Sequence, residues 1–371
     1  MEVLERAQEL QRRDRSIIHL EVGEPDFPTP EPICEAAVRA VREGHTHYTH
    51  SLGMPRLRDA IARRYSRQSG IEVGPDRIMV TSGSSQAMLY AFGALVRPGD
   101  EVIMATPHYP CYPNFIRFFG GVPVEITTDA SDGYKLDPDR VRDAVTDRTR
   151  LLLLNSPANP TGAVLEADRL EALAEIGVPI LSDEIYHGIV YGEPARSALS
   201  VTDHAIVVDG FSKRFSMTGW RLGYVIAPKQ LMRALQTMQQ NFMISPGAFV
   251  QEAAITAVEE GDAATEAMVG AYRARRDLIV ALFRELGFGI PAVPEGAFYV
   301  FADASRFTRD SMAFAFELLE CAGVAVAPGI DFGEAGRSCI RLCYAASEED
   351  IREAAQRIAV YIACREFPVE K

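Results

Sequence analysis

The chain has 371 residues, a length that suits two or three structural units better than one small core. Apolar residues make up 47% and charged residues 24%, the balance of a globular protein that folds in water. The net charge of −13 argues against nucleic acid or an anionic membrane as a partner. The sequence lacks the long apolar run of a membrane span and the apolar stretch of a signal peptide, so we expect a cytoplasmic protein.

Short apolar segments alternate with helical patterns along the middle of the chain. Strands are predicted at 77–81, 101–105, 122–126, 151–155, 179–182, 205–209 and 222–227. Their nearly continuous apolar character is typical of strands buried on both faces. Helical patterns follow Gly83 and cover 170–176, among others. This alternation predicts an α/β fold with a mostly parallel, doubly wound sheet.

The two ends of the chain have a different pattern. The first 45 residues suggest an opening helix, an extended stretch at 17–22 and a helix that starts near Pro32. From about residue 280 we expect a helix, a strand at 297–301, a helix from Ser311, a strand at 337–343 and a last helix from Ser347. We therefore predict a large domain of residues 46–279 and a smaller α+β domain built from 1–45 and 280–371. Ligands usually bind between such units, where strands end.

Polar residues gather directly after the predicted strands. The segment TSGSSQA turns through Gly83 into a helix whose N-terminus can bind a phosphate, although helix capping is the simpler explanation of its serines. The segment NSPANPTG holds Asn159 rigidly between two prolines. In SDEIYHG, Asp183 ends a buried strand, which calls for a structural ion pair or a cationic ligand atom.

Two cations eight residues apart, Lys213 and Arg221, stand in DGFSKRFSMTGWRLGY. A desolvated lysine with cationic neighbours loses its proton more easily and can form a Schiff base. An acid such as Asp183 can hold a pyridinium nitrogen, and Arg221 with a glycine–serine helix start can bind a phosphate. Together these features predict pyridoxal 5'-phosphate as the cofactor.

Six motifs carry a resemblance to a known family. They are GEPDF (23–27), YTHSLG (48–53), NPTG (159–162), DEIY (183–186), SK with R and G further on (212–223) and RLCYA (341–345). Over almost its whole length the chain resembles the class I/II aminotransferases, which are pyridoxal-phosphate enzymes of fold type I. The resemblance implies an enzyme that moves the amino group of an α-amino acid to a 2-oxo acid, such as 2-oxoglutarate, by a ping-pong mechanism.

The resemblance also implies the roles of individual residues. Lys213 corresponds to the Schiff-base lysine that carries the substrate proton, Asp183 to the partner of the pyridine nitrogen, and Tyr186 to a partner of the ring phenolate. The remaining cofactor contacts would come from Gly83, Ser84, Ser85, Tyr109, Asn159, Ser212 and Arg221.

Substrate contacts and a partner subunit are implied as well. Arg341 would clamp the substrate α-carboxylate, with Asn159 and the backbone at Gly23 beside it. Tyr48 would reach the phosphate of a neighbouring subunit, which implies a homodimer with shared active sites.

Several points stay open at this stage. Some relatives that act on aspartate or glutamate carry a lysine at the position of Ser85, so the amino donor of this chain is undetermined. A β-lyase that acts on cysteine conjugates is the alternative reaction on the same scaffold. We expect no metal site in HTHYTH (45–50), and Cys339 and Cys343 form either ordinary packing or a redox pair.

Overall fold

The computed structural model describes residues 2–365. Within these residues a seven-stranded sheet has the order β2-β8-β7-β6-β5-β3-β4. Its strands are β2 (Ile78–Thr81), β3 (Glu101–Thr106), β4 (Val122–Thr127), β5 (Thr149–Asn155), β6 (Ile180–Asp183), β7 (Ile206–Gly210) and β8 (Gly223–Ile226). Strands β3 to β7 run parallel, and β8 is antiparallel to both neighbours. The predicted α/β fold with a mostly parallel sheet is confirmed.

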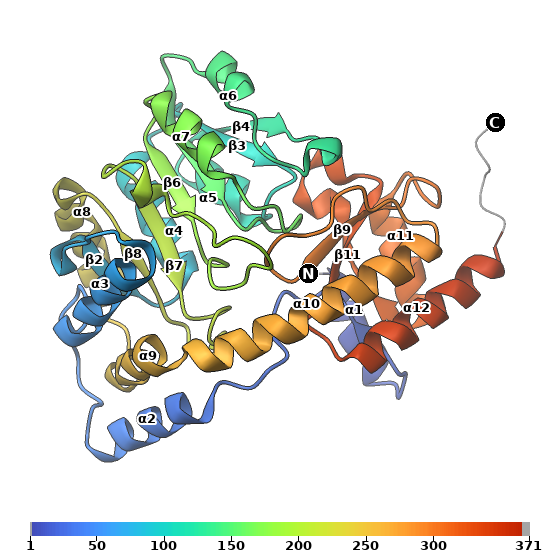
Figure 1. Cartoon of the computed structure of the whole chain (residues 1–371), viewed down its shortest axis with the longest axis horizontal. Helices are drawn as coiled ribbons and strands as arrows, with labels where there is room; N and C mark the ends of the chain where they lie inside the picture. Colours follow the sequence, from blue (N-terminus) through green and yellow to red (C-terminus); the bar gives the residue numbers. More distant parts are fainter. Residues whose placement is uncertain (1, 366–371) are drawn as a thin grey trace.

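Helices cover both faces of this sheet (Figure 1). Along a strand, successive side chains point to opposite faces, and here they enter two separate cores. Val102 and Met104 belong to one core, whereas Ile103 between them belongs to the other. Helices of the first core are α4 (Ser84–Leu95), α5 (Cys111–Phe118) and α8 (Lys229–Phe242); those of the second are α2 (Glu31–Arg42), α3 (Pro55–Ser69), α6 (Pro138–Ala144), α7 (Ala167–Glu175) and α9 (Ala248–Glu260).

Strand β4 departs from the expectation of burial on both faces. Val122 at its start is 47% exposed, and most of its other side chains are partly exposed. It is an edge strand that pairs with β3 alone, but edge position is not sufficient for exposure, because β2 at the other edge is buried along its whole length.

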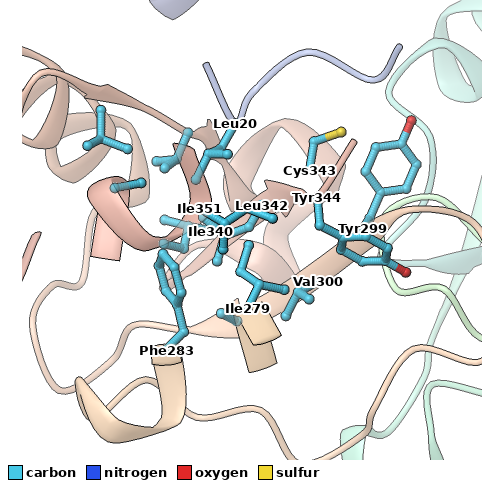
Figure 2. Close-up of a cluster of buried hydrophobic side chains, with 14 of the residues drawn as sticks. Leu20, Ile279, Phe283, Tyr299, Val300, Ile340, Leu342, Cys343, Tyr344 and Ile351 are labelled. Carbon is cyan, nitrogen blue, oxygen red and sulfur yellow. The ribbon is translucent and has the colours of Figure 1, made fainter. Parts of the chain in front are cut away.

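Smaller sheets join the two ends of the chain. Strands β9 (Tyr299–Asp303), β11 (Ala327–Pro328) and β12 (Cys339–Cys343) form an antiparallel sheet, and β1 (Ile18–His19) pairs in parallel with β10 (Val324–Ala325). Helices α1 (Glu2–Gln11), α11 (Ser311–Glu317) and α12 (Glu348–Ala363) belong to the same end of the molecule (Figure 1). Figure 2 shows Leu20, from the N-terminal segment, in one buried cluster with Leu342 and Ile351.

Helix α10 (Asp262–Glu285) links the two parts of the molecule (Figure 1). The sequence placed a helix after about residue 280, but this helix begins at Asp262 and is continuous through that point. Its residues Met268, Tyr272, Ile279 and Phe283 pack into the core of the chain ends. The predicted boundary after residue 279 therefore falls inside α10, and the division into two domains stays a prediction.

Candidate active site

A cavity of about 540 Å³ lies where β5, β6 and β7 end, against β11 and β12. Parallel strands carry their carboxyl ends to one edge, so the polar residues that follow them meet there. Most of the predicted site residues line this cavity: Gly23, Ser84, Ser85, Tyr109, Asn159, Asp183, Tyr186, Ser212, Lys213, Arg221 and Arg341. The topology thus gathers residues that are up to 318 positions apart, from Gly23 to Arg341.

Lys213 follows the end of β7 and directs its amine into the cavity, where Nζ donates a hydrogen bond to the backbone oxygen of Gly23. Burial lowers the pKa of this lysine to about 8, and the positive charges of Arg341 and Arg221 act in the same direction. The amine is therefore more easily deprotonated than an ordinary lysine, as a nucleophile or a proton carrier requires.

Asp183 is the last residue of β6 and is only 7% exposed. Its Oδ2 accepts a hydrogen bond from Tyr112 Oη at 2.7 Å, and its Oδ1 accepts one from the Ile185 amide at 3.2 Å. Burial raises the pKa of this carboxyl to about 6, against the effect of these hydrogen bonds. A cationic ring nitrogen beside it would stabilise the ionised form.

Asn159 is held in place by Asn155 at the end of β5. The Asn155 Oδ1 accepts from the Asn159 amide at 2.9 Å, while its Nδ2 donates to the Asp183 backbone oxygen at 3.0 Å. The Asn159 Oδ1 accepts from Arg341 Nη1 at 3.1 Å, which leaves its Nδ2 as a donor. Asn159 is thereby positioned between a cofactor site and the arginine.

Arg341 sits at the middle of β12 with its guanidinium between two aromatic rings. The Cζ atom lies 4.4 Å from the ring centroid of Tyr299 and 4.9 Å from that of Phe332. Its Nη2 donates to the backbone oxygen of Glu21, and its Nε is buried with no hydrogen-bond partner among residues 2–365. A buried unpaired donor is costly, and a carboxylate in the cavity would satisfy it.

The opposite end of the cavity is suited to a phosphate. Ser84 begins helix α4, whose first amides are free to face an anion, and Ser212 is buried beside Lys213. Gly83 precedes them with a φ of 89°, and a Cβ there would lie 2.5 Å from Nη2 of Arg221. Glycine is required at this position both for the backbone conformation and for the approach of the guanidinium.

Two predicted residues do not line the cavity. Gly83 lies behind it, against Arg221, whereas Tyr48 is 82% exposed on the surface of this chain. An exposed tyrosine cannot serve the cavity of its own chain, so its predicted role depends on a second subunit.

These residues fit pyridoxal phosphate. The cavity contains the amine of Lys213, whose pKa is lowered, and the buried carboxyl of Asp183. It also contains Arg341, whose Nε has no hydrogen-bond partner among the described residues, and the N-terminus of α4 together with Arg221. Each matches one group of the cofactor or of an amino-acid substrate: the aldehyde, the ring nitrogen, the substrate carboxylate and the phosphate.

Comparison with known protein families identifies the family of this chain. The family described as aminotransferase class I and II matches residues 15–358. The chain belongs to the class I and II aminotransferases. It is an enzyme that depends on pyridoxal phosphate, as predicted.

Similar proteins carry several different names within this family. An aspartate/prephenate aminotransferase of Thermus thermophilus is 44% identical over 363 residues, which are 95% of this chain and 93% of that protein. A valine–pyruvate aminotransferase of Mycobacterium tuberculosis is 40% identical and covers 98% of this chain and 95% of its own length. The structure of a Thermus thermophilus aspartate aminotransferase with maleate matches with a TM-score of 0.93 at 42% identity, over 96% of this chain and 95% of that one.

The aminotransferase site contains residues that the sequence analysis missed. Tyr112 hydrogen-bonds Asp183, Asn155 positions Asn159, and Tyr299 contacts both Tyr186 and Arg341. Both tyrosines stand in apolar segments, where an aromatic residue usually means core packing.

Of the histidines next to site residues, His108 is buried and His187 is partly buried, and neither lines the cavity. His108 lies against Glu125 at 3.6 Å, and His187 Nδ1 lies 3.3 Å from Glu184 Oε2.

The remaining sequence expectations concern metal, cysteines and location. Across residues 2–365 there is no group of three or more His, Cys, Asp or Glu arranged to hold a metal ion. In the same range the cysteines are free, with Cys343 buried and Cys339 partly buried. No helix of the described chain is both long and apolar enough to cross a membrane. The cytoplasmic location stays a prediction.

Proposed function

We propose that this aminotransferase transfers the amino group of an α-amino acid to a 2-oxo acid, with 2-oxoglutarate as an acceptor. The observation that carries the proposal is the presence of Lys213 and Arg341 in one cavity, the amine with a pKa of about 8 and the guanidinium with a buried, unpaired Nε. One group can move a proton at the α carbon while the other holds the α-carboxylate.

Lys213 is the proposed proton carrier. Its Nζ would take the proton from the substrate α carbon and keep it inside the cavity, shielded from bulk water, until it is returned. The neighbouring charges of Arg341 and Arg221 support this role, since they disfavour a permanently charged amine. Bound pyridoxal phosphate supplies the electron sink that makes the α proton acidic.

Asp183 and Tyr186 would hold the ring of the cofactor in its reactive form. The Asp183 carboxylate lines the cavity and would pair with the ring nitrogen, where its negative charge would keep that nitrogen protonated. The Tyr186 hydroxyl and Asn159 Nδ2 would donate to the ring oxygen. Ser84, Ser85, Ser212 and Arg221 would bind the phosphate.

A single carboxylate clamp predicts ping-pong kinetics. Arg341 is the arginine that lies beside Asn159 in the cavity, so the amino donor and the oxo acceptor would occupy the same place in turn. We expect parallel lines in double-reciprocal plots against either substrate. An intersecting pattern would contradict this assignment.

The side-chain end of the cavity favours neutral amino acids. Among the described lining residues the lysines and arginines are Lys213, Arg221 and Arg341, each of which has a proposed task. Ser85, at the position where some relatives that act on dicarboxylates carry a lysine, lines the cavity. The wall from the chain ends carries the apolar residues Val3, Leu4, Val22, Ala327, Pro328 and Phe332 together with the acids Glu21 and Asp331, which would disfavour a second carboxylate. A neutral pocket discriminates modestly, so we propose broad use of aliphatic and aromatic donors.

A homodimer is proposed from the surface around Tyr48. Phe242 is 71% exposed, and Met243, Ile244 and Phe249 are exposed beside it in sequence and at the start of α9. The Thr49 amide donates to Ser245 Oγ at 3.2 Å, which brings the Tyr48 segment next to this apolar surface. Surfaces of this kind usually mark interfaces, and a second copy would place Tyr48 in a neighbouring cavity. Sedimentation equilibrium that gives a monomer mass would contradict the dimer.

Replacement of Lys213 tests the central assignment. We expect Lys213→Ala to lower turnover on the order of 10⁴-fold, because both the nucleophile and the proton carrier are lost. Borohydride should fix pyridoxal phosphate on the peptide that contains residue 213 in the wild type and leave the variant unlabelled. The matched control is Lys229→Ala, since Lys229 pairs with Asp76 far from the cavity and should be dispensable. Near-normal turnover in Lys213→Ala would overturn the assignment.

A donor panel separates transamination from β-elimination. With alanine, valine, phenylalanine, aspartate and a cysteine conjugate, an aminotransferase accumulates pyridoxamine phosphate and needs an oxo acid for turnover. A β-lyase instead releases pyruvate and ammonia from the conjugate without any acceptor. Sustained release of this kind, with no transamination of the other donors, would refute the proposed reaction.

A further inference from the structure

Tyr299 occupies the junction between the cofactor side and the substrate side of the cavity. It is the first residue of β9, is 1% exposed and yet contributes to the cavity wall. It lies in the buried cluster of the chain ends (Figure 2), so the small sheet fixes its position. In the β9–β12 register it pairs with Cys343, two residues from Arg341.

The hydroxyl of Tyr299 contacts the hydroxyl of Tyr186 at 2.7 Å. Burial raises the pKa of both phenols, so each hydroxyl keeps its proton at neutral pH. Each group can donate one hydrogen bond and accept others. A phenolate oxygen carries no proton, so Tyr186 has to donate when it faces one. Its oxygen is then free to accept from Tyr299, which strengthens its own donation.

The ring of Tyr299 lies against the guanidinium of Arg341, 4.4 Å from Cζ to the ring centroid. The same residue therefore touches the group that would orient the cofactor oxygen and the group that would bind the carboxylate. A third contact locks the hydroxyl in place, because a Cβ built on Gly23 would lie 2.3 Å from Tyr299 Oη. The Gly23 backbone packs directly on this hydroxyl.

We propose that Tyr299 is a positioning residue that directs the Tyr186 hydroxyl proton to the cofactor ring oxygen and links it to the Arg341 clamp. The inference rests on the proposed roles of Lys213, Tyr186 and Arg341. The hydroxyl serves the first task and the aromatic ring serves the second, so the two can be separated by substitution.

The test is the pH titration of the visible absorbance of the bound pyridoxal phosphate. Donation to the ring oxygen stabilises its negative charge and lowers the proton affinity of the lysine–cofactor linkage. Tyr299→Phe keeps the ring and loses the hydroxyl, so the midpoint should move to higher pH by about three- to tenfold in proton affinity, the size of one hydrogen bond. Tyr344→Phe is the matched control, because that hydroxyl contacts the Ala297 backbone oxygen at 3.3 Å outside the cavity wall. The control should keep the wild-type midpoint.

Two further variants make the test decisive. Tyr186→Phe should shift the midpoint more than Tyr299→Phe, and the double variant should match Tyr186→Phe alone, because Tyr299 acts through Tyr186. Tyr299→Leu removes the ring as well and should raise the KM for both substrates, whereas Tyr299→Phe should not. If Tyr299→Phe fails to fold, Tyr299→Leu, which also lacks the hydroxyl, should shift the midpoint in the same direction.

An unchanged midpoint in Tyr299→Phe, or additive shifts in the double variant, would overturn the role of the hydroxyl. An unchanged KM in Tyr299→Leu would overturn the link to Arg341. Failure of the proposed function has a different signature, because the wild type would then show no cofactor band and no label at Lys213.

Discussion

Two neighbouring acids on β6 and just beyond it, Asp183 and Glu184, are both buried but have opposite surroundings. Glu184 is fully buried, and its Oε1 accepts from Ser182 Oγ, Ser197 Oγ and the Ala198 amide at 2.9–3.0 Å. Asp183 accepts two hydrogen bonds and faces the cavity. Burial raises the pKa of Glu184 to about 7 and that of Asp183 to about 6.

The comparison separates a structural acid from a functional one. A raised pKa records only that a carboxyl has been removed from water, and both acids satisfy that criterion. What distinguishes Asp183 is access to a ligand together with Lys213 and Tyr186 in the same cavity. Glu184 is enclosed by protein on the other side of the strand, where its hydrogen bonds fasten the 197–198 segment.

The largest expected difference between these acids is in catalysis. Asp183→Asn should lower kcat on the order of 10³-fold, because it removes the charge opposite the ring nitrogen. Glu184→Gln should leave kcat within about threefold, because Glu184 does not line the cavity. Steady-state kinetics with saturating pyridoxal phosphate measures both. Equal losses of kcat in the two variants would contradict a catalytic role that belongs to Asp183 and not to Glu184.

The second prediction concerns the pH dependence of stability. The folded protein holds the Glu184 proton up to about pH 7, whereas the unfolded chain releases it near the ordinary pKa of 4.5. The wild type should therefore lose stability relative to Glu184→Gln as pH rises through this interval, by on the order of 3 kcal/mol. Urea unfolding of the cofactor-free proteins at pH 4.5, 6 and 7.5 measures the difference.

A surface variant serves as the control for this pH effect. Glu260→Gln alters an exposed acid at the end of α9 and should follow the wild type at every pH. A constant difference between Glu184→Gln and the wild type would mean that Glu184 is ionised in the folded protein throughout.

The smallest predicted effects come from single hydrogen-bond donors. Tyr112→Phe removes a donor to Asp183 and should lower kcat/KM about tenfold with little change in stability. Ser197→Ala removes a donor to Glu184 and should cost about 1–2 kcal/mol of stability with unchanged kinetics. Steady-state kinetics and thermal unfolding should be measured for both variants. A loss of kcat/KM in Ser197→Ala would contradict the purely structural role of Glu184.

The sequence predicted the sheet and much of the site for a physical reason. Buried parallel strands are nearly continuously apolar, so polar residues at or just after their ends stand out, as Asp183 does at the end of β6 and Lys213 does three residues after β7. The exposure of β4 was missed because it depends on how the strand is covered in the folded chain, which composition does not record; β2, the other edge strand, is buried throughout. The start of α10 was missed for another reason, since the helical patterns of α9 and α10 follow one another almost without a break.

The tyrosines around the site were the hardest residues to predict. Tyr112 and Tyr299 are almost fully buried, and their rings pack as core residues do. Their functional value lies in where one oxygen atom points, and that direction is set by tertiary contacts with Asp183 and Tyr186. The order of the motifs pointed to Tyr48. Because Tyr48 is exposed on this chain, its predicted role depends on a second subunit.

The pairing of β1 with β10 joins residues 18–19 to residues 324–325. A nascent polypeptide emerging from the ribosome would expose Lys213 and the central sheet well before Arg341 is translated. The first strand would wait for a partner roughly three hundred residues downstream, so this contact closes late in biosynthesis. The arginine proposed to bind the substrate carboxylate is thus the last part of the cavity to be synthesised.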